Sequence, residues 1–283
     1  MKNVTFYKFD IEPENNLRLD QLISSRLPEY SRSTIKNWIN AEKILVNGKV
    51  CSPKDKISSK SEIEIEVHPC EDIDILSEEI PLNILYEDDD FIVVNKSSGM
   101  VTHTAAGNYT GTLQNALLFR YPELRDVPRA GIIHRLDKQT SGLLIIARTL
   151  QSHNYLTQQI QNKLISKKYI TIASGILRNI SVINQKIGRH KINRKKMAVT
   201  DSGKESTSRI KILRRFDKAS IIEVDLVTGR THQIRVHLSF IGHPVLGDKL
   251  YGFKKSIFSK NTELVNFLDS YNGHALHAMS LEF

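Results

Sequence analysis

The alternation of hydrophobic and polar residues predicts a small module at the start of the chain. Aliphatic residues within 17–27 recur at the spacing of one buried helix face, and a proline then ends that helix. A second stripe of this kind follows at residues 35–39. Residues 44–50 read as a strand with an Asn-Gly turn, and residues 62–67 alternate as a half-buried strand does. We expect these elements to form one compact domain over residues 1–68.

The pattern after residue 81 is that of a larger domain with both strands and helices. Strand-like apolar runs recur there, and turn residues separate several of them; we expect strands at residues 84–86, 91–95, 143–148, 168–173, 221–227 and 233–237. Helical spacing is clearest at residues 110–120 and 151–165. The fold class predicted for residues 82–283 is therefore α+β, built on a mainly antiparallel mixed sheet.

An acidic segment separates the two patterns. Residues 69–81 begin and end with proline and carry several Asp and Glu residues, so we expect a linker there. A chain of 283 residues with 40% hydrophobic residues can bury one large core and one smaller core. Length and pattern thus agree on two domains.

Charge is segregated along the chain, which has a formal net charge of +9. Ten Lys or Arg and no acidic residues lie between Lys163 and Lys196, whereas twelve Asp or Glu and no Lys or Arg lie between Glu62 and Asp90. A long basic segment repels itself in water, so a phosphate backbone explains it better than a solvated surface does. We expect a nucleic-acid partner.

The cysteines and the N-terminus limit the class of protein further. Cys51 and Cys70 have no CxxC spacing, which favours neither a disulfide framework nor a zinc site. The first ten residues lack the apolar core of a signal peptide, and no apolar run approaches the ~18 residues that span a bilayer. We expect a cytoplasmic protein with no membrane association.

One carboxylate stands out among the candidate chemical groups. Asp137 lies in a polar interruption between two aliphatic runs of the segment 131–146, which we interpret as buried strand, exposed loop and buried strand. Such a loop would hold the carboxylate at a fixed point. Arg135 and Lys138 beside it favour the ionised form, which suits a nucleophile or a base. The alternative is that Asp137 only caps a turn.

The string HRLDKQTSG around Asp137 resembles the catalytic signature of the RluA-type pseudouridine synthases. Further blocks resemble the same family and cover nearly the whole larger domain: residues 86–96, Lys168-Tyr169, TGRTHQIRVH at 228–237, residues 242–252 and residues 275–278. The resemblance implies conversion of uridine to pseudouridine in RNA, with the target base turned out of the RNA helix. It implies neither a cofactor nor a catalytic metal.

The resemblance also implies roles for particular residues. Asp137 would be the catalytic carboxylate, Tyr169 the residue that contacts the base and relays a proton, and Arg235 the partner of Asp137. Arg235 stands between two aliphatic residues of an expected strand, so we place it on the opposite face, pointing into a cleft. Several further residues are expected to contact RNA: Arg135 as a wedge at the vacated base position, His134, Lys168 and Arg230. The remaining histidines are expected to be structural.

Residues 18–50 resemble the alpha-L RNA-binding motif of a small-subunit ribosomal protein. In that family two helices form a basic surface for RNA, which here would be built from Arg18, Arg26, Arg32, Lys36 and Lys43. A small protein-interaction domain is the alternative. Together the two resemblances imply a partner in large-subunit ribosomal RNA or its precursor particle, and a monomeric enzyme.

Two other functions are compatible with the sequence. One is the same chemistry on transfer RNA or another RNA, because target choice depends on RNA shape. The other is a catalytically impaired RNA-binding or ribosome-assembly protein. Its motivation is that the chain ends at Phe283, where similar proteins continue with a further strand-forming segment, so an edge of the sheet would be left exposed.

Overall fold

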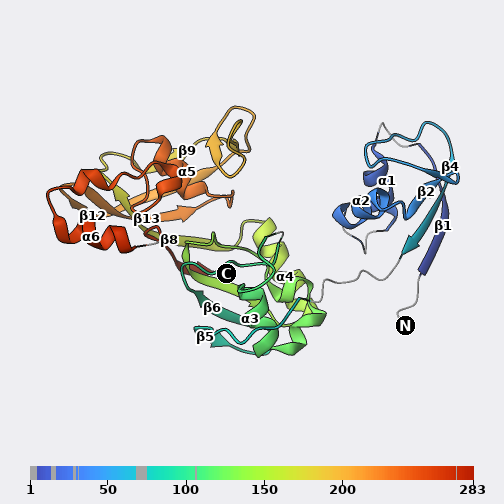
Figure 1. The fold of residues 1–283 in the computed structure, drawn as a ribbon, viewed down its shortest axis with the longest axis horizontal. Coiled ribbons are helices and arrows are strands. Elements are labelled where there is room, and N and C mark those ends of the chain that lie inside the picture. Colours follow the sequence, from blue (N-terminus) through green and yellow to red (C-terminus); the bar gives the residue numbers. More distant parts are fainter. Residues whose placement is uncertain are drawn as a thin grey trace. The chain divides into compact units, whose positions relative to one another are not determined.

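The computed structural model describes residues 5–13, 17–27, 30, 32–67, 75–105, 107–271 and 273–283. The chain divides into two compact units, Met1–Ile75 and Leu76–Phe283 (Figure 1). Their boundary falls inside the segment expected to be a linker, of which residues 69–74 lie outside the described part. Asn115 donates a hydrogen bond of 2.7 Å to the carbonyl of Leu76 and accepts one of 3.1 Å from the amide of Glu78, so this part of the segment is bonded to the larger unit.

The smaller unit packs two helices on a sheet in the order β1-β4-β2-β3. Its elements are β1 (Thr5–Ile11), α1 (Leu19–Arg26), α2 (Arg32–Asn40), β2 (Ile44–Val46), β3 (Lys49–Val50) and β4 (Ser61–Val67). The aliphatic stripes of both helices are buried in one cluster with Ile44, Ile63 and Ile65, as expected. Asn47 and Gly48 join β2 to β3 with φ angles of 52° and 72°, the left-handed backbone of a tight hairpin turn.

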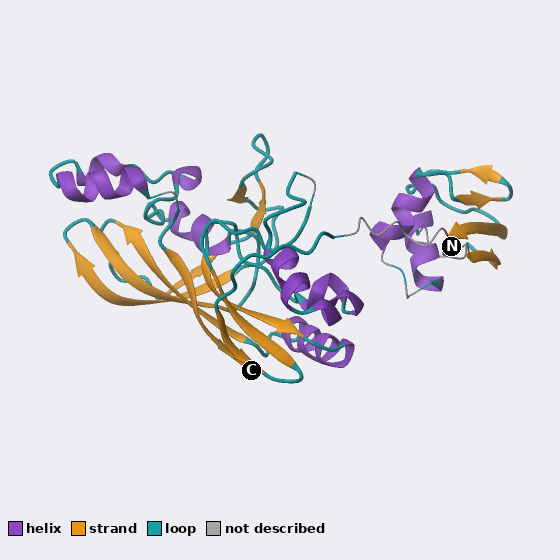
Figure 2. Cartoon of the chain, turned by 60° about the horizontal axis from the view of Figure 1, so that its bottom comes forward, coloured by secondary structure: helices purple, strands orange, loops and turns teal. Residues whose placement is uncertain are grey.

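The larger unit is organised around one long sheet. Within the described residues this sheet has eight strands in the order β5-β6-β7-β14-β8-β13-β12-β9, and only the β7–β14 pair is parallel. Its strands are β5 (Ile84–Glu87), β6 (Phe91–Lys96), β7 (Ser141–Ala147), β8 (Ser166–Ser174), β9 (Val182–Asn184), β12 (Thr207–Phe216), β13 (Ala219–Leu226) and β14 (Leu276–Glu282). Figure 2 shows the strands as one continuous twisted surface. The mainly antiparallel mixed sheet is confirmed.

Helices and a separate hairpin complete the larger unit. The α-helices are α3 (Leu113–Arg120), α4 (Leu150–Gln161), α5 (Gln233–Phe240) and α6 (Thr262–Ser270), and the 3-10 helices are η1 (Pro122–Asp126), η2 (Pro128–Gly131), η3 (Lys249–Tyr251) and η4 (Lys255–Phe258). Strands β10 (Ile187–Arg189) and β11 (Met197–Val199) form an antiparallel hairpin of their own. In Figure 1, α3 and α4 lie with β5 and β6, while α5 and α6 lie with β12 and β13.

The end of the chain lies in the interior of the sheet. Strand β14 pairs with β7 on one side and with β8 on the other, so the outer strands of this sheet are β5 and β9. Only His277 and Ala278 of β14 pair with β7, so residues 280–282 pair with β8 alone. In the described part of the chain, no helix combines the length and apolar character needed to cross a bilayer.

Two local expectations are corrected. Residues 233–237 form the start of helix α5 rather than a strand. A short apolar run that is buried on all sides has no polar face to reveal its period, and residues 233–238 are all buried. The aliphatic run before Asp137 is also not a regular strand, since Ile132 forms only an isolated bridge to Ile146.

Candidate active site

The loop that carries Asp137 is fixed by its backbone. Thr140 N–H donates to the carbonyl of Asp137 at 3.0 Å, which closes a tight turn. The hydroxyl of Thr102 donates to the carbonyl of Leu136 at 3.0 Å, and Gly99 N–H donates to the carbonyl of Lys138 at 2.8 Å. The last two bonds come from the segment that follows strand β6, so Asp137 is presented from a rigid base.

Buried Lys96 ties the same loop to β6. Its side chain is 1% exposed, and Nζ donates to the carbonyls of Ser97, Met100 and Lys138 at 2.8, 2.9 and 3.3 Å. Burial lowers the pKa of Lys96 to about 8, and the charge of Asp137 acts in the opposite direction. Lys96 therefore anchors the Asp137 loop and also supplies positive charge beneath it.

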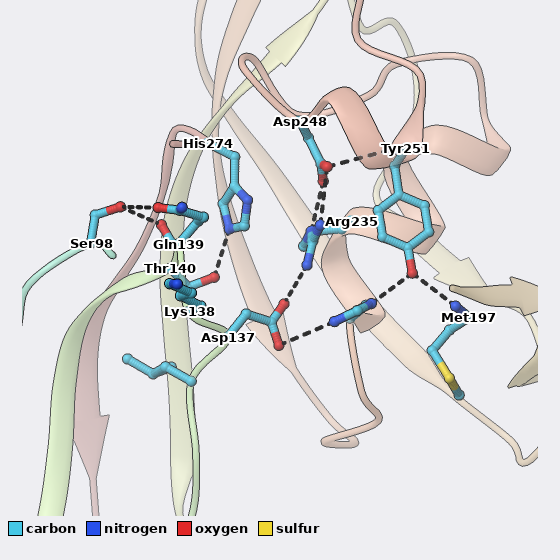
Figure 3. Close-up of polar contacts among 12 residues, drawn as sticks. Ser98, Asp137, Lys138, Gln139, Thr140, Met197, Arg235, Asp248, Tyr251 and His274 are labelled. Atoms are coloured by element: carbon cyan, nitrogen blue, oxygen red, sulfur yellow. Dashed lines mark hydrogen bonds and ion pairs between the residues drawn. The ribbon is translucent and has the colours of Figure 1, made fainter. Parts of the chain in front are cut away.

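Arg235 on α5 reaches Asp137 from the other half of the sheet (Figure 3). Its Nη1 donates to Oδ2 of Asp137 at 2.8 Å. The rest of the guanidinium is held by Asp248, whose Oδ2 accepts from Nε at 2.6 Å and whose Oδ1 accepts from Nη2 at 3.0 Å. Both side chains of this second pair are almost fully buried. The bidentate bond leaves one edge of the guanidinium pointing at Asp137.

Opposing effects set the protonation of Arg235. Burial alone would lower its pKa, but the hydrogen bond and charge of Asp248, followed by those of Asp137, raise the pKa on balance. The ring of Tyr251 lies 4.8 Å from the guanidinium carbon and adds a cation–π contact. Arg235 is therefore a permanent cation beside the carboxylate of Asp137.

Asp137, Tyr169 and Arg235 line one cavity of about 700 Å³. Tyr169 lies on β8 with its side chain buried, and within the described residues its hydroxyl has no hydrogen-bond partner. Burial, and then the charge of Asp137, raise the pKa of Tyr169 well above its usual value. The hydroxyl therefore stays protonated and can donate to a bound molecule.

Comparisons with known proteins show the family of this chain. The family profile for RNA pseudouridylate synthase matches residues 90–240, and the S4 domain profile matches residues 17–63. The chain belongs to the RNA pseudouridylate synthase family. It is 43% identical over 267 residues to ribosomal large subunit pseudouridine synthase D of Pseudomonas aeruginosa, covering 94% of this chain and 83% of that one. The protein of the same name from Neisseria meningitidis is 45% identical, over 94% of this chain and 71% of that one.

Solved structures place the fold in the same group. Human RNA pseudouridylate synthase domain containing 1 matches with a TM-score of 0.57 and 28% identity, over 72% of this chain and 79% of that chain. Human RNA pseudouridylate synthase domain containing 4 matches with a TM-score of 0.55 over 70% of this chain and 83% of that chain. Its identity is 21%, so it supports the fold alone. The family and fold expected from the sequence are confirmed.

The cavity lined by Asp137, Tyr169 and Arg235 also includes three of the four residues of the larger unit that were expected to contact RNA. Arg135 is exposed at the rim, and Arg230 lines the cavity while Nε donates to the carbonyl of Glu205 at 3.3 Å. His134 also lines it, but Nε2 accepts the amide N–H of Ile145 at 3.1 Å. Burial, followed by the charge of Lys167, lowers the pKa of His134 to about 3. This bond favours a structural role for His134.

Lys168, the fourth of these residues, does not line the cavity. Its Nζ forms an ion pair of 2.6 Å with Glu282 of the neighbouring strand β14. Lys167 lines the cavity instead, because residues 167 and 169 share one face of β8. Burial lowers the pKa of Lys167, and in the described part of the chain its side chain has no hydrogen-bond or ion-pair partner. The basic side chain of β8 that lines the cavity with Tyr169 is thus Lys167.

In the S4 unit, part of the expected basic surface is held by an acidic residue. Arg18 and Arg32 both bond to Asp20, at 3.0 and 2.9 Å, and the Asp20 side chain is only 3% exposed. Lys43 lies 3.9 Å from Glu66, whereas Lys36 is exposed on α2. The two arginines remain partly exposed, so Asp20 orders them without removing them from the surface.

Asp248 and Lys96 were not identified as site residues from the sequence. For Lys96 a signal exists, because Ile92, Val94 and Lys96 alternate on the buried face of β6. Asp248 lies within the family-like block 242–252, but no local pattern singles it out. Among the described residues, no group of three or more His, Cys, Asp and Glu side chains is placed to hold a metal ion.

Proposed function

We propose that this RNA pseudouridine synthase acts on uridines of large-subunit ribosomal RNA, with Asp137 as its catalytic nucleophile. The target is supported by relatives named for ribosomal large subunit modification that are 40–45% identical over most of the chain. The observation that carries the role of Asp137 is its ion pair with Arg235 at the cavity wall, with Arg235 itself fixed by Asp248. A ribosomal RNA substrate also supports a cytoplasmic location.

The reaction is an isomerisation in which no external reagent is consumed. The bond between N1 of the base and C1′ of the ribose breaks, the base turns, and a bond forms between C5 and C1′. C5 loses a proton and N1 gains one, so the atoms balance within the nucleotide. In this proposal the carboxylate of Asp137 adds to the nucleoside, and the hydrogen bond from Arg235 keeps that carboxylate oriented.

Tyr169 is proposed as the contact for the turned-out base. Its ring can lie against the base. Its protonated hydroxyl can donate a hydrogen bond to the base or relay a proton to it. Because burial raises its pKa, Tyr169 acts as a neutral phenol rather than as a phenolate base.

Arg135 is proposed as the residue that fills the place of the base in the RNA. Its exposed guanidinium stands at the rim of the cavity, two residues before Asp137, and a planar cation stacks well on neighbouring bases. Arg135→Ala should lower kcat/KM on a folded RNA more than on an unstructured oligonucleotide, since only the folded RNA must be unstacked. Arg135→Lys keeps the charge without the plane and should behave like Arg135→Ala. Equal defects on both RNAs would argue against the wedge.

The decisive experiment is carbodiimide mapping of pseudouridine on unmodified large-subunit ribosomal RNA. We expect new reverse-transcription stops with the wild-type enzyme and with Asp201→Asn, a matched change at an exposed turn. Asp137→Asn should give no stops while its RNA affinity stays within about threefold, because the change removes the nucleophile and leaves the basic surface. Stops with Asp137→Asn would refute the role of Asp137. Stops only on added transfer RNA would refute the ribosomal target.

A further inference from the structure

A line of contacts runs from the β10–β11 hairpin to Asp137. Met197, the first residue of β11, donates its backbone N–H to the hydroxyl of Tyr251 at 2.9 Å. The same hydroxyl lies 2.7 Å from Nδ1 of His232, and Nε2 of His232 lies 3.6 Å from Oδ1 of Asp137. Figure 3 shows Met197, Tyr251 and Asp137 along this line. His232 thus approaches the carboxylate oxygen that Arg235 does not contact.

The contacts of the Tyr251 hydroxyl favour one tautomer of His232. The Tyr251 oxygen already accepts the N–H of Met197, so its one proton is available for Nδ1 of His232. Burial raises the pKa of Tyr251 and lowers that of His232, so the phenol is protonated and the imidazole is neutral. A neutral ring that accepts at Nδ1 carries its proton on Nε2. This N–H is directed at Asp137.

The backbone conformation of His232 indicates that the surrounding structure holds its side chain in a set direction. His232 precedes helix α5 with φ 57° and ψ 21°, in the left-handed region that residues other than glycine seldom adopt. The turn before it is held by Gln233, whose Oε1 accepts from the amide of Arg230 and from the hydroxyl of Thr228. The strained position is thus maintained by its surroundings, which is common where a side chain must be aimed.

The hairpin connects this line to the surface. Its inner side packs on α5 and Tyr251 through a cluster that contains Ile187, Val236, Met197 and Val199. Its outer end, residues 190–196, carries several cations and Ile192, whose side chain is 90% exposed. The tip is ordered by His190, whose Nδ1 accepts the amides of Ile192 and Asn193 at 3.2 and 3.1 Å. Basic groups around an exposed aliphatic side chain suit an RNA with accessible bases.

We propose that His232 is a positioning residue for Asp137, that Tyr251 sets its tautomer, and that the β10–β11 hairpin couples RNA docking to this arrangement. When RNA engages the tip, the Met197 amide and Tyr251 move His232 Nε2 from 3.6 Å to hydrogen-bonding distance of Asp137. Such contacts are often long in an enzyme without substrate and shorten in the complex. Asp137 is then held by Arg235 on one oxygen and by His232 on the other.

The tautomer can be tested by ¹⁵N NMR of the imidazoles, with the His232 signals assigned by their loss in His232→Gln. In the wild type we expect a protonated Nε2 and a bare Nδ1. Tyr251→Phe keeps the ring packing but removes the hydroxyl, so His232 should become a mixture of both tautomers. Tyr155→Phe, a matched change at an exposed side chain, should leave the signals unchanged. A wild-type His232 protonated on Nδ1 would overturn the proposal.

The coupling can be tested with a double-mutant cycle on the RNA substrate. Tyr251→Phe and His232→Gln should each lower kcat about tenfold, which is the decrease expected when one hydrogen bond to a charged group is lost. Neither variant should change the RNA affinity much. A tip variant, Lys191→Ala with Arg194→Ala and Lys195→Ala, should weaken RNA binding and also lower kcat. In the Tyr251→Phe background the tip variant should weaken binding only. Rate effects that multiply in the combined variant would refute the coupling.

Discussion

The buried bond between Arg235 and Asp248 should dominate the stability of the larger unit around the active site. Asp248→Asn keeps the shape of the side chain, but it removes a charge and places an amide N–H₂ against the guanidinium donors. Arg235 and Asp248 have side chains that are 7% and 2% exposed, so water cannot replace the lost bond. Breaking a buried, hydrogen-bonded ion pair costs roughly 3–5 kcal/mol, and because Arg235 keeps Asp137 as a second partner we expect about 3 kcal/mol here.

This loss is large enough to measure by thermal unfolding. For a unit of this size about 3 kcal/mol corresponds to a fall in Tm of roughly 6–12 °C. The chain contains a single tryptophan, Trp38, which lies in the core of the smaller unit. Circular dichroism should therefore show the lower Tm, while the tryptophan fluorescence transition should stay in place. Asp269→Asn removes the exposed partner of Lys255 and should change stability by less than about 1 kcal/mol.

The same variant should be impaired in catalysis although Asp248 does not line the cavity. A looser guanidinium lets the carboxylate of Asp137 rotate, and misplacement by about 1 Å can cost on the order of 10²-fold in rate. Pseudouridine formation should therefore fall well below the wild type at a temperature at which Asp248→Asn is fully folded. The reasoning is refuted if Asp248→Asn unfolds and turns over like Asp269→Asn.

Two further predictions concern the cavity. Lys167→Met should weaken RNA binding and reduce the slope of log affinity against log salt by about 1, since one phosphate contact is lost. Lys168→Met should leave this slope unchanged, because Lys168 is paired with Glu282. Binding titrations over a range of salt would decide this, and identical slopes for the two variants would contradict it. The larger unit should lose stability as pH falls from about 6.5 towards about 3, because the unfolded chain protonates His134 first while burial keeps its folded pKa near 3. Urea unfolding at several pH values should show this slope flattened in His134→Gln; an unchanged slope would remove His134 as its cause.

Local pattern was sufficient for the elements with one buried face. The helices of the smaller unit and strands β4, β6, β8 and β13 lie close to their expected positions, because one side of each is more buried than the other. Strand β7 is buried on both faces, and its continuous aliphatic run predicted it. The short strands β9, β10 and β11 and the long strand β12 were not expected. In β12, Arg and Lys residues cover the exposed side and much of the strand has no buried face to mark it.

The family resemblance predicted the residue types of the candidate site and the pairing of Arg235 with Asp137, but not the contacts that support them. The resemblance of HRLDKQTSG identified Asp137, and the geometry brings Tyr169 and Arg235 to the same cavity. The structure alone places Asp248 behind Arg235, turns residues 233–240 into a helix and brings Lys96 beneath the loop. Each of these depends on partners far away in the chain.

The sequence by itself determined the family, the two-part organisation and the candidate for the reactive carboxylate, because these depend on local motifs and on the period of burial. Tertiary structure alone decided how distant charges are brought together and which buried carboxylate holds Arg235 in place. Arg235 and Asp137 are 98 positions apart, and they come into contact because β14 inserts between β7 and β8 and closes the two halves into one sheet. Local periodicity reports whether a side chain is buried, whereas the partner of a buried charge is set by how the sheet closes.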